Sequence, residues 1–214
     1  MMTESISEIF DRIYCINLDR RKDRLELFQE ETKRWGLEGI RRYPGMDGND
    51  LPERYKGTRK FPRSAIGLVM TNIKILEECL SDQVSSVLIL EDDVVFTPRM
   101  RSAGEILGGL PENWDSLYLG GNHNSHKGVS PPKKVSDGLC KIHHTFSTHA
   151  VGFKGDFIQE VLDRIGRVDS PLDVAYTDLQ KIHNFYCFYP ALAVQRSGYS
   201  DIQNQTMDYS KWIK

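Results

Sequence analysis

Two periodicities of apolar residues alternate along the first part of the chain. Residues 12–18 and 40–43 are short segments rich in β-branched and aromatic side chains, which is typical of strands. Residues 20–35 and 64–80 repeat apolar side chains at helical spacing, which predicts two amphipathic helices. The stretch 44–63 is rich in Pro, Gly and basic residues, and it fits either a basic active-site loop or a solvated connector.

The strongest strand signal is the apolar run within residues 85–96, which reaches three consecutive acids. A run this continuous predicts a central strand covered on both faces. Beyond it, we expect strands over 114–119, 140–144, 149–153 and 185–194, helices over 99–110, 156–165 and 172–182, a polar loop over 122–138 and a polar tail from Gln195. Because strands alternate with helices, the pattern predicts an α/β fold with a mixed, mainly parallel central sheet flanked by helices.

The composition narrows the classes of function without identifying one. The 214 residues are 39% hydrophobic and 27% charged, as expected for a folded globular protein. The net charge of −2 argues against a generally polycationic chain, so we expect no nucleic-acid partner. No apolar run approaches the roughly 20 residues that span a bilayer, so we expect no transmembrane segment. The four cysteines lack CxxC spacing, which indicates reduced thiols and a cytoplasmic location rather than a zinc site or a disulfide framework.

Glu91, Asp92 and Asp93 carry the clearest chemical signal. A strand is expected to carry them to its carboxyl end, where ligands bind in open α/β sheets. Clustered carboxylates repel one another unless a cation or hydrogen bonds compensate. Because Mg²⁺ and Mn²⁺ prefer such oxygens and share substrate phosphates, we interpret the cluster as a site for Mn²⁺ or Mg²⁺. A solvated acidic turn is the alternative interpretation.

A second charged segment, residues 17–24, follows the first predicted strand and reads Asn-Leu-Asp-Arg-Arg-Lys-Asp-Arg. The loop after strand one commonly reaches the ligand crevice of an α/β fold, where Arg and Lys bind phosphates through charge-assisted hydrogen bonds. The same pattern fits the solvated face of a helix, in which the arginines oppose Asp19 and Asp23. Composition alone favours this second interpretation.

Several motifs together resemble glycosyltransferase family 25, the lipopolysaccharide-biosynthesis and collagen-galactosyltransferase group. Residues 13–24 resemble the opening motif of the family, and residues 90–94, Leu-Glu-Asp-Asp-Val, resemble its acidic metal motif. Residues 43–48, 171–173 and 195–202 are also similar to family segments and fall in the expected order. The resemblance therefore covers nearly the whole chain.

The resemblance implies a GT-A-like fold in one domain over residues 1–214. Residues of about 12–121 would form the nucleotide-sugar-binding half, and residues of about 122–202 the acceptor half. It also implies a metal-dependent enzyme that moves a hexose from a nucleotide-sugar donor to a glycan or other hydroxyl acceptor. The donor is usually a UDP-sugar, and the anomeric carbon is inverted.

Under this resemblance, Glu91 and Asp93 are expected to hold the metal, with Asp93 as the first choice for direct contact. The remaining ligands would come from water and substrate phosphates. Tyr199 and Asp201 are expected to close over the diphosphate, unless they belong to a frayed tail. The residues expected to bind the donor are Asn17, Leu18, Asp19, Arg20, Arg24, Asp92, His149 and Ser200.

Inversion in one displacement needs a general base for the acceptor hydroxyl. Asp173 is our candidate, because it stands at a predicted helix start after Pro171, where the helix dipole favours the carboxylate form. Asp178 in the same helix is the reserve candidate. The alternative for Asp173 is an ordinary aspartate at a helix N-terminus.

Two other functions fit parts of the same pattern. A nucleotidyl or phosphoryl enzyme would use the same acids, but such sites often hold two metals and draw carboxylates from separate strands, whereas the sequence has one strong acidic cluster. A non-catalytic nucleotide-sugar-binding domain would keep the acids and residues 17–24 yet tolerate loss of Asp173. Hydrolysis or transfer of a donor separates such a domain from an enzyme.

Overall fold

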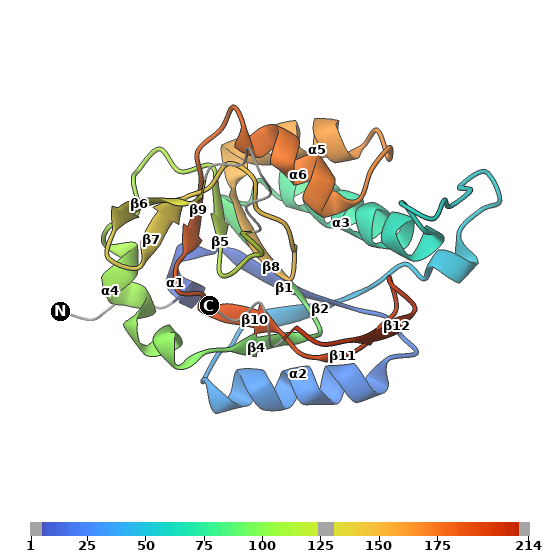
Figure 1. Ribbon diagram of the computed structural model, residues 1–214, viewed down its shortest axis with the longest axis horizontal. Helices are drawn as coiled ribbons and strands as arrows, with labels where there is room; N and C mark the ends of the chain where they lie inside the picture. Colours follow the sequence, from blue (N-terminus) through green and yellow to red (C-terminus); the bar gives the residue numbers. More distant parts are fainter. Residues whose placement is uncertain (1–5, 124–130, 210–214) are drawn as a thin grey trace.

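A mixed eight-stranded sheet with helices on both faces organises the molecule (Figure 1). The structure is a computed structural model that describes residues 6–123 and 131–209. The helices are α1 (Ile6–Ile9), α2 (Lys22–Arg34), α3 (Arg63–Ser81), α4 (Ala103–Leu107), α5 (Ile158–Ile165) and α6 (Leu172–Gln180). The strands are β1 (Arg12–Asn17), β2 (Ile40–Pro44), β3 (Ser86–Glu91), β4 (Val94–Phe96), β5 (Ser116–Tyr118), β6 (Lys133–Ser136), β7 (Leu139–Lys141), β8 (Ala150–Lys154), β9 (Phe185–Phe188), β10 (Ala193–Gln195), β11 (Gly198–Ser200) and β12 (Gln205–Met207).

The strand order of the main sheet is β2-β1-β3-β8-β5-β9-β7-β6. Parallel pairing joins β2, β1 and β3 and also joins β5 with β9, whereas the other neighbours pair antiparallel. Helices α2 and α3 supply the crossovers that the parallel strands require. The carboxyl ends of β1, β2 and β3 therefore meet at one edge. This topology confirms the predicted α/β architecture with a mixed central sheet flanked by helices, and its first half is parallel and its second half mixed.

Side-chain alternation along β3 builds a core on each face of the sheet. Val87 and Ile89 point into one apolar cluster, which also takes side chains from α3, α5 and α6. Leu88 and Leu90 point into the opposite cluster, which takes side chains from α1, α2 and α4. Figure 1 shows α2 on one side of the sheet and α3, α5 and α6 on the other. The prediction of a central strand covered on both faces is confirmed.

The expected single strand over 85–96 is wrong in its second half. β3 ends at Glu91, the chain turns at Asp92 and Asp93, and β4 leaves the main sheet to pair with β10. The apolar pattern resumes at Val94 directly after the acids, so the sequence reads as one strand, and both turn aspartates are buried in the structure. The turn matters for function, because it leaves the acids at the edge where the parallel strands end.

The C-terminal third also differs from its expected elements. The expected strand over 185–194 is divided into β9 and β10 by a segment that contains Pro190, which has no backbone N–H for a sheet. The chain after Gln195, expected as a polar tail, forms the β11–β12 hairpin. Part of the loop expected over 122–138 forms β6, while residues 124–130 of that loop lie outside the described residues.

The remaining sequence expectations concern thiols and membranes. Cys15, Cys79, Cys140 and Cys187 are all free and buried, as expected for reduced thiols. Within residues 6–123 and 131–209, no helix has the length and apolar character needed to cross a membrane.

Candidate active site

A cavity of about 1240 Å³ lies at the carboxyl ends of β1 and β3. Its walls come from the loop after β1, the start of α3, the turn after β3, the segment before β8, the start of α6 and the chain from β10 to β12. Ligands bind at this edge in open α/β folds. The charged side chains that line the cavity are Arg20, Arg24, Asp47, Arg59, Lys60, Glu91, Asp92, Asp93, Asp173 and Asp201.

Glu91 and Asp93 are two acids of this cavity that protein groups compensate only in part; Asp93 Oδ2 lies 3.7 Å from Arg24 Nη1. Glu91 ends β3, and its Oε1 accepts a hydrogen bond of 2.8 Å from Thr148 Oγ1. Asp93 is 7% exposed, and its Oδ1 has no hydrogen-bond partner among the described residues. Burial raises the pKa of both carboxyl groups. Repulsion from Asp93 raises the pKa of Glu91 further, repulsion from Asp92 raises the pKa of both, and Arg24 lowers both. A positive ligand at this point would stabilise their charged forms.

Asp92, between these two acids in the sequence, is satisfied by protein groups. Its Oδ2 accepts a hydrogen bond of 2.7 Å from Asn17 Nδ2, and its Oδ1 accepts one of 2.9 Å from Arg24 Nη1. The Asp92 and Arg24 side chains are 8% and 17% exposed, so they form a largely buried ion pair. The Oδ1 atom of Asn17 in turn accepts a hydrogen bond of 2.9 Å from Arg42 Nε. Asp92 thus fastens the end of β1 and the first turn of α2 to the turn after β3.

The β11–β12 hairpin is docked onto the arginines that follow β1. Arg20 Nη1 donates a hydrogen bond of 2.7 Å to Asp201 Oδ1, and Arg21 binds the second oxygen of Asp201. Arg24 Nη2 donates to the carbonyl oxygen of Tyr199 at 2.6 Å. Ser200, between them, lines the cavity. These contacts hold the hairpin in place, so this segment is not a frayed tail.

His149 lies beside the acids because of strand pairing. The antiparallel register of β3 and β8 continues past Ala150, so the His149 carbonyl accepts a hydrogen bond of 2.9 Å from the Glu91 amide. Its ring Nε2 lies 3.1 Å from the carbonyl oxygen of Ala193, and its Nδ1 has no hydrogen-bond partner in the described part of the chain. Burial lowers the pKa of His149 to about 4, so the ring is neutral at neutral pH.

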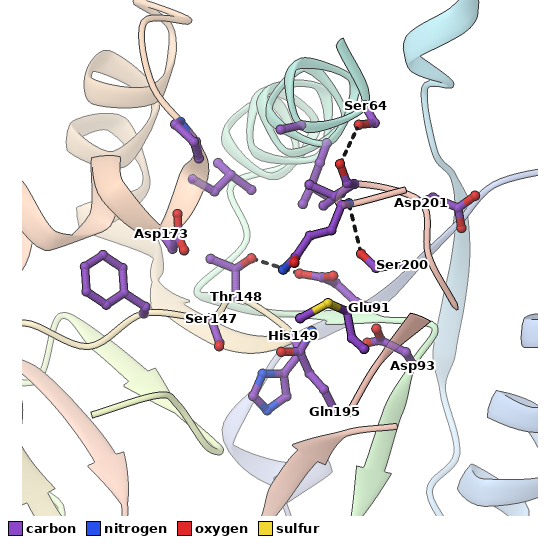
Figure 2. Close-up of a pocket in the computed structure, with 18 of the residues that line it drawn as sticks. Ser64, Glu91, Asp93, Ser147, Thr148, His149, Asp173, Gln195, Ser200 and Asp201 are labelled. Carbon is purple, nitrogen blue, oxygen red and sulfur yellow. Dashed lines mark hydrogen bonds between the residues drawn. The ribbon is translucent and has the colours of Figure 1, made fainter. Parts of the chain in front are cut away.

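Asp173 lies in the first turn of α6, on the side of Glu91 away from Asp201 (Figure 2). Its Oδ1 accepts a hydrogen bond of 2.8 Å from the Val174 amide. Burial raises the pKa of Asp173, and backbone amides, including that of Ser147, offset only part of the rise. The helix dipole alone favours the carboxylate form, but desolvation outweighs it here.

Asp178, the reserve candidate for a base, does not line the cavity. Its carboxylate pairs with Arg164 at 2.9 Å and with Lys181 at 2.8 Å on the exposed side of α6. These ion pairs lower the pKa of Asp178. The two aspartates of α6 therefore have opposite environments, and Asp173 is the one that faces the cavity.

The predicted donor-binding residues divide into two groups. Asn17 and Asp19 do not line the cavity. Asn17 donates a hydrogen bond to Asp92, and Asp19 is 80% exposed and pairs with Arg42. The predicted donor residues that do line it are Leu18, Arg20, Arg24, Asp92, His149 and Ser200.

Sequence reasoning missed three polar residues of the site. Thr148 binds Glu91, Asp47 Oδ2 accepts a hydrogen bond of 2.6 Å from Arg20, and Ser64 Oγ donates one of 3.4 Å to the carbonyl oxygen of Ile202. Asp47 had a visible signal, because it belongs to an Asp-Gly turn and to residues 43–48, which resemble a family segment, but it was not singled out as a site residue. Thr148 had none, because nothing in the sequence reveals that β8 lies antiparallel to β3 and brings its preceding residues to the acids.

Glu91 and Asp93 could hold a metal ion only in a site with two protein carboxylates and further ligands from elsewhere. Within residues 6–123 and 131–209, no group of three or more His, Cys, Asp and Glu side chains is arranged to hold an ion. Glu91 and Asp93 make a two-carboxylate set, which fits a Mg²⁺-like ion that retains waters and shares substrate phosphates. The unpartnered Oδ1 of Asp93 agrees with this fit.

Comparisons with known proteins agree on a family. Glycosyltransferase family 25 (LPS biosynthesis protein) matches residues 10–127. A Glycosyltransferase 25 family member of Drosophila melanogaster is 28% identical over 161 residues, covering 67% of this chain and 26% of that protein. Procollagen galactosyltransferase 2 of Mus musculus is 23% identical over 168 residues, with 67% and 26% covered. The chain thus spans about a quarter of the length of these relatives.

Among solved structures, a glycosyltransferase involved in the glycosylation of the major capsid of PBCV-1 aligns with 86% of this chain and 92% of its own. The TM-score is 0.47 and the sequence identity is 11%.

Proposed function

The chain belongs to glycosyltransferase family 25, and from this premise we propose that it transfers a hexose from a nucleotide-sugar donor to a glycan or other hydroxyl acceptor. A UDP-sugar is the donor we expect, with inversion at the anomeric carbon and dependence on Mn²⁺ or Mg²⁺. One observation carries the proposal. Two carboxylates, Glu91 and Asp93, line a large cavity at the carboxyl edge of the sheet together with Asp173, and Asp93 Oδ1 has no hydrogen-bond partner among the described residues.

Glu91 and Asp93 are the residues that would hold the metal ion. The chemistry that a divalent ion would supply there is to neutralise charge developing on a diphosphate leaving group. Asp92 supports the ion indirectly, because its two oxygens already bind Asn17 and Arg24 and keep the turn in place. In this proposal, Glu91 and Asp93 bind the metal ion and Asp92 holds the turn, which accounts for three consecutive acids.

Asp173 is the base in the proposed transfer. The acceptor hydroxyl oxygen forms a bond to the anomeric carbon from the face opposite the diphosphate. The bond between that carbon and the diphosphate oxygen breaks, and the leaving group keeps the electron pair. The hydroxyl proton passes to the Asp173 carboxylate, whose basicity is increased by burial.

The loop after β1 supports recognition of the diphosphate. Arg20 lines the cavity with its side chain 48% exposed, so it has room to meet a phosphate. Arg59 and Lys60 are exposed at the cavity wall as well. Arg24 has less freedom, because it is bound to Asp92 and to the Tyr199 carbonyl.

Release of the nucleotide from candidate donors tests the proposal. UDP-galactose, UDP-glucose and UDP-N-acetylglucosamine would be incubated with the protein and simple sugar acceptors, in Mn²⁺ or in EDTA. We expect UDP release from one donor in Mn²⁺ only. Asp173→Asn and Asp93→Asn should each abolish most of it. Asp178→Asn is the matched control for Asp173→Asn, because it removes an aspartate of the same helix outside the cavity.

Three results would overturn parts of the proposal. UDP release that is as fast in EDTA as in Mn²⁺ would show that the reaction does not need a metal ion. Cleavage at the nucleotide phosphorus instead of the sugar carbon, detected by ³¹P NMR, would indicate a nucleotidyl or phosphoryl enzyme. Donor binding without turnover, unchanged in Asp173→Asn, would indicate a non-catalytic binding domain. The configuration of the product, read by ¹H NMR, decides between inversion and retention.

A further inference from the structure

One wall of the cavity is aromatic rather than charged. We call it the aromatic wall, and it consists of His123, Phe146 and Tyr189, all of which line the cavity. Tyr189 lines the cavity and is 43% exposed. Pockets that bind small molecules are lined mainly by apolar and aromatic side chains with a few polar groups, and this wall has that character.

The Tyr189 ring is held in position by a network that leads to α6. His123 packs edge-on against it, with ring centroids 5.6 Å apart and planes at 68°. The His123 Nδ1 atom lies 2.8 Å from Thr145 Oγ1. Thr145 is held by Gln180, whose Oε1 accepts a hydrogen bond of 2.7 Å from the Thr145 amide and whose Nε2 donates one of 2.9 Å to its carbonyl. The wall is thus fixed relative to the helix that carries Asp173.

Phe146 is supported in the same way. It packs edge-on against His144, with ring centroids 4.7 Å apart and planes at 89°. Its backbone exchanges two hydrogen bonds with Asn122, of 2.9 and 3.0 Å. Two residues later, Thr148 binds Glu91. The Phe146 ring is therefore linked to the metal-binding acid through one short, anchored segment.

We propose that Tyr189 and Phe146 form the acceptor subsite and that its occupant is the pyranose ring of a carbohydrate. The inference rests on the proposed function, because it assigns the acceptor of that reaction. A pyranose has a C–H face that packs on an aromatic ring and hydroxyls at its edge that bind carboxylates. Phe146 is followed by Ser147, whose amide interacts with the Asp173 carboxylate, so a sugar on the wall would present a hydroxyl near the base.

A peptide acceptor would call for other features. Recognition of extended peptides relies on main-chain pairing with a strand edge, on an apolar groove, on charged clusters or, for Pro-rich segments, on a continuous groove lined by aromatic side chains. The aromatic wall instead offers separate ring faces, each fixed by a histidine. Preorganised rings lose little freedom when a rigid sugar binds, which favours a carbohydrate occupant.

Saturation-transfer difference NMR of the protein with methyl glycosides tests the subsite without a donor. Methyl galactoside, glucoside, mannoside and N-acetylglucosaminide would be compared, first with the unmodified protein. We expect signals on the ring C–H protons of at least one glycoside. Tyr189→Ala and Phe146→Leu should each weaken its binding roughly tenfold, as expected for loss of one aromatic contact. Tyr189→Phe should bind normally, because the ring remains.

Ile182→Ala is the control, because Ile182 is 77% exposed and does not line the cavity. Circular dichroism would check that each variant is folded. The proposal is overturned if no glycoside binds, or if binding is the same in Tyr189→Ala as in the unmodified protein. It is also overturned if a hydroxyl-bearing collagen-like peptide accepts the sugar equally well in both proteins. Missing UDP release with intact glycoside binding would instead count against the proposed function alone.

Discussion

The two walls of the cavity differ in how their side chains are held, and so in how each would bind a ligand. On the donor wall, formed by the loop after β1, the turn after β3 and the β11–β12 hairpin, charged groups are paired with one another, as Arg24 is with Asp92 and Arg20 with Asp201. On the aromatic wall, rings are fixed by histidines and Asp173 is the nearby charge. A charged ligand on the donor wall would have to replace ion pairs between protein side chains. A sugar on the aromatic wall would bind rings that are already fixed in position.

Two neighbouring acids of the donor wall, Asp92 and Asp93, also differ in their contacts. Asp92 binds Asn17 and Arg24 with both oxygens, whereas Asp93 Oδ1 has no partner among the described residues. A buried charge with partners stabilises a structure when they are already in place, and removing one partner is costly. Asp93 Oδ2 lies 3.7 Å from Arg24 Nη1, but its Oδ1 is left available to bind a cation. Adjacent residues of one turn therefore have opposite expected effects on stability and activity.

The largest effect is expected at Asp173, where the two walls meet. Asp173→Asn keeps the shape and removes the base, so turnover should fall by roughly 10²–10⁴-fold while donor affinity is unchanged. Steady-state kinetics with a saturating donor measures the change. A fall in donor affinity that matches the fall in turnover would show that Asp173 binds the donor instead.

Asp93→Asn should cost about a hundredfold or more in turnover, because a metal ion contributes several kcal/mol of charge stabilisation. The same variant should not be destabilised without metal, since it removes a buried charge that lacks a full set of partners. Urea unfolding in EDTA, beside kinetics in Mn²⁺, tests both parts. A less stable Asp93→Asn protein would contradict the distinction from Asp92.

Asp92→Asn is expected to act on stability. It leaves Arg24 without its main partner in a largely buried place, so the free energy of unfolding should fall by about 2 to 3 kcal/mol. Urea unfolding with the paired variants Arg24→Gln and Arg24→Gln/Asp92→Asn would give the coupling energy. Additive effects of the two substitutions would show that the ion pair is unimportant.

The smallest effect is expected at Asp201. Asp201→Asn weakens the ion pair with Arg20, whose side chain is 48% exposed, and the more buried pair with Arg21. Because both pairs tie down a terminal hairpin rather than the main sheet, global stability should fall less than in Asp92→Asn. Hydrogen exchange should rise in residues 198–207 and stay constant in the main sheet. Faster exchange in β1 or β3 as well would show that the hairpin supports the core.

The donor wall was the more predictable of the two. The apolar run before Glu91 and the basic segment after β1 are local signals, and parallel crossovers bring both to one edge of a sheet. The aromatic wall depends on antiparallel pairing of β8 with β3 and on a bridge between Asn122 and Phe146. Such registers join residues distant in sequence, so Thr148 and Phe146 carried no local signal of their position.

Secondary-structure elements were predictable where the hydrophobic pattern has a clear period, and not where long-range contacts decide the structure. Strands and helices with a clear period, such as β1 and α3, lie close to their expected bounds. The β3–β4 boundary was not predictable, because the apolar residues 94–96 follow the acids directly and extend the strand pattern. The β11–β12 hairpin is polar and depends on ion pairs to the arginines after β1, which a hydrophobic pattern does not reveal.

Thermal unfolding with UDP-sugars tests the central claim most directly, namely that Glu91 and Asp93 bind a donor through a metal ion. A donor at about 100 times its Kd stabilises the folded protein by roughly 2.7 kcal/mol. We predict such a shift for one UDP-sugar in Mn²⁺, its loss in EDTA and in Asp93→Asn, and its retention in Tyr189→Ala. A folded protein that shows no shift with any donor, or a shift that survives both EDTA and Asp93→Asn, would contradict the claim.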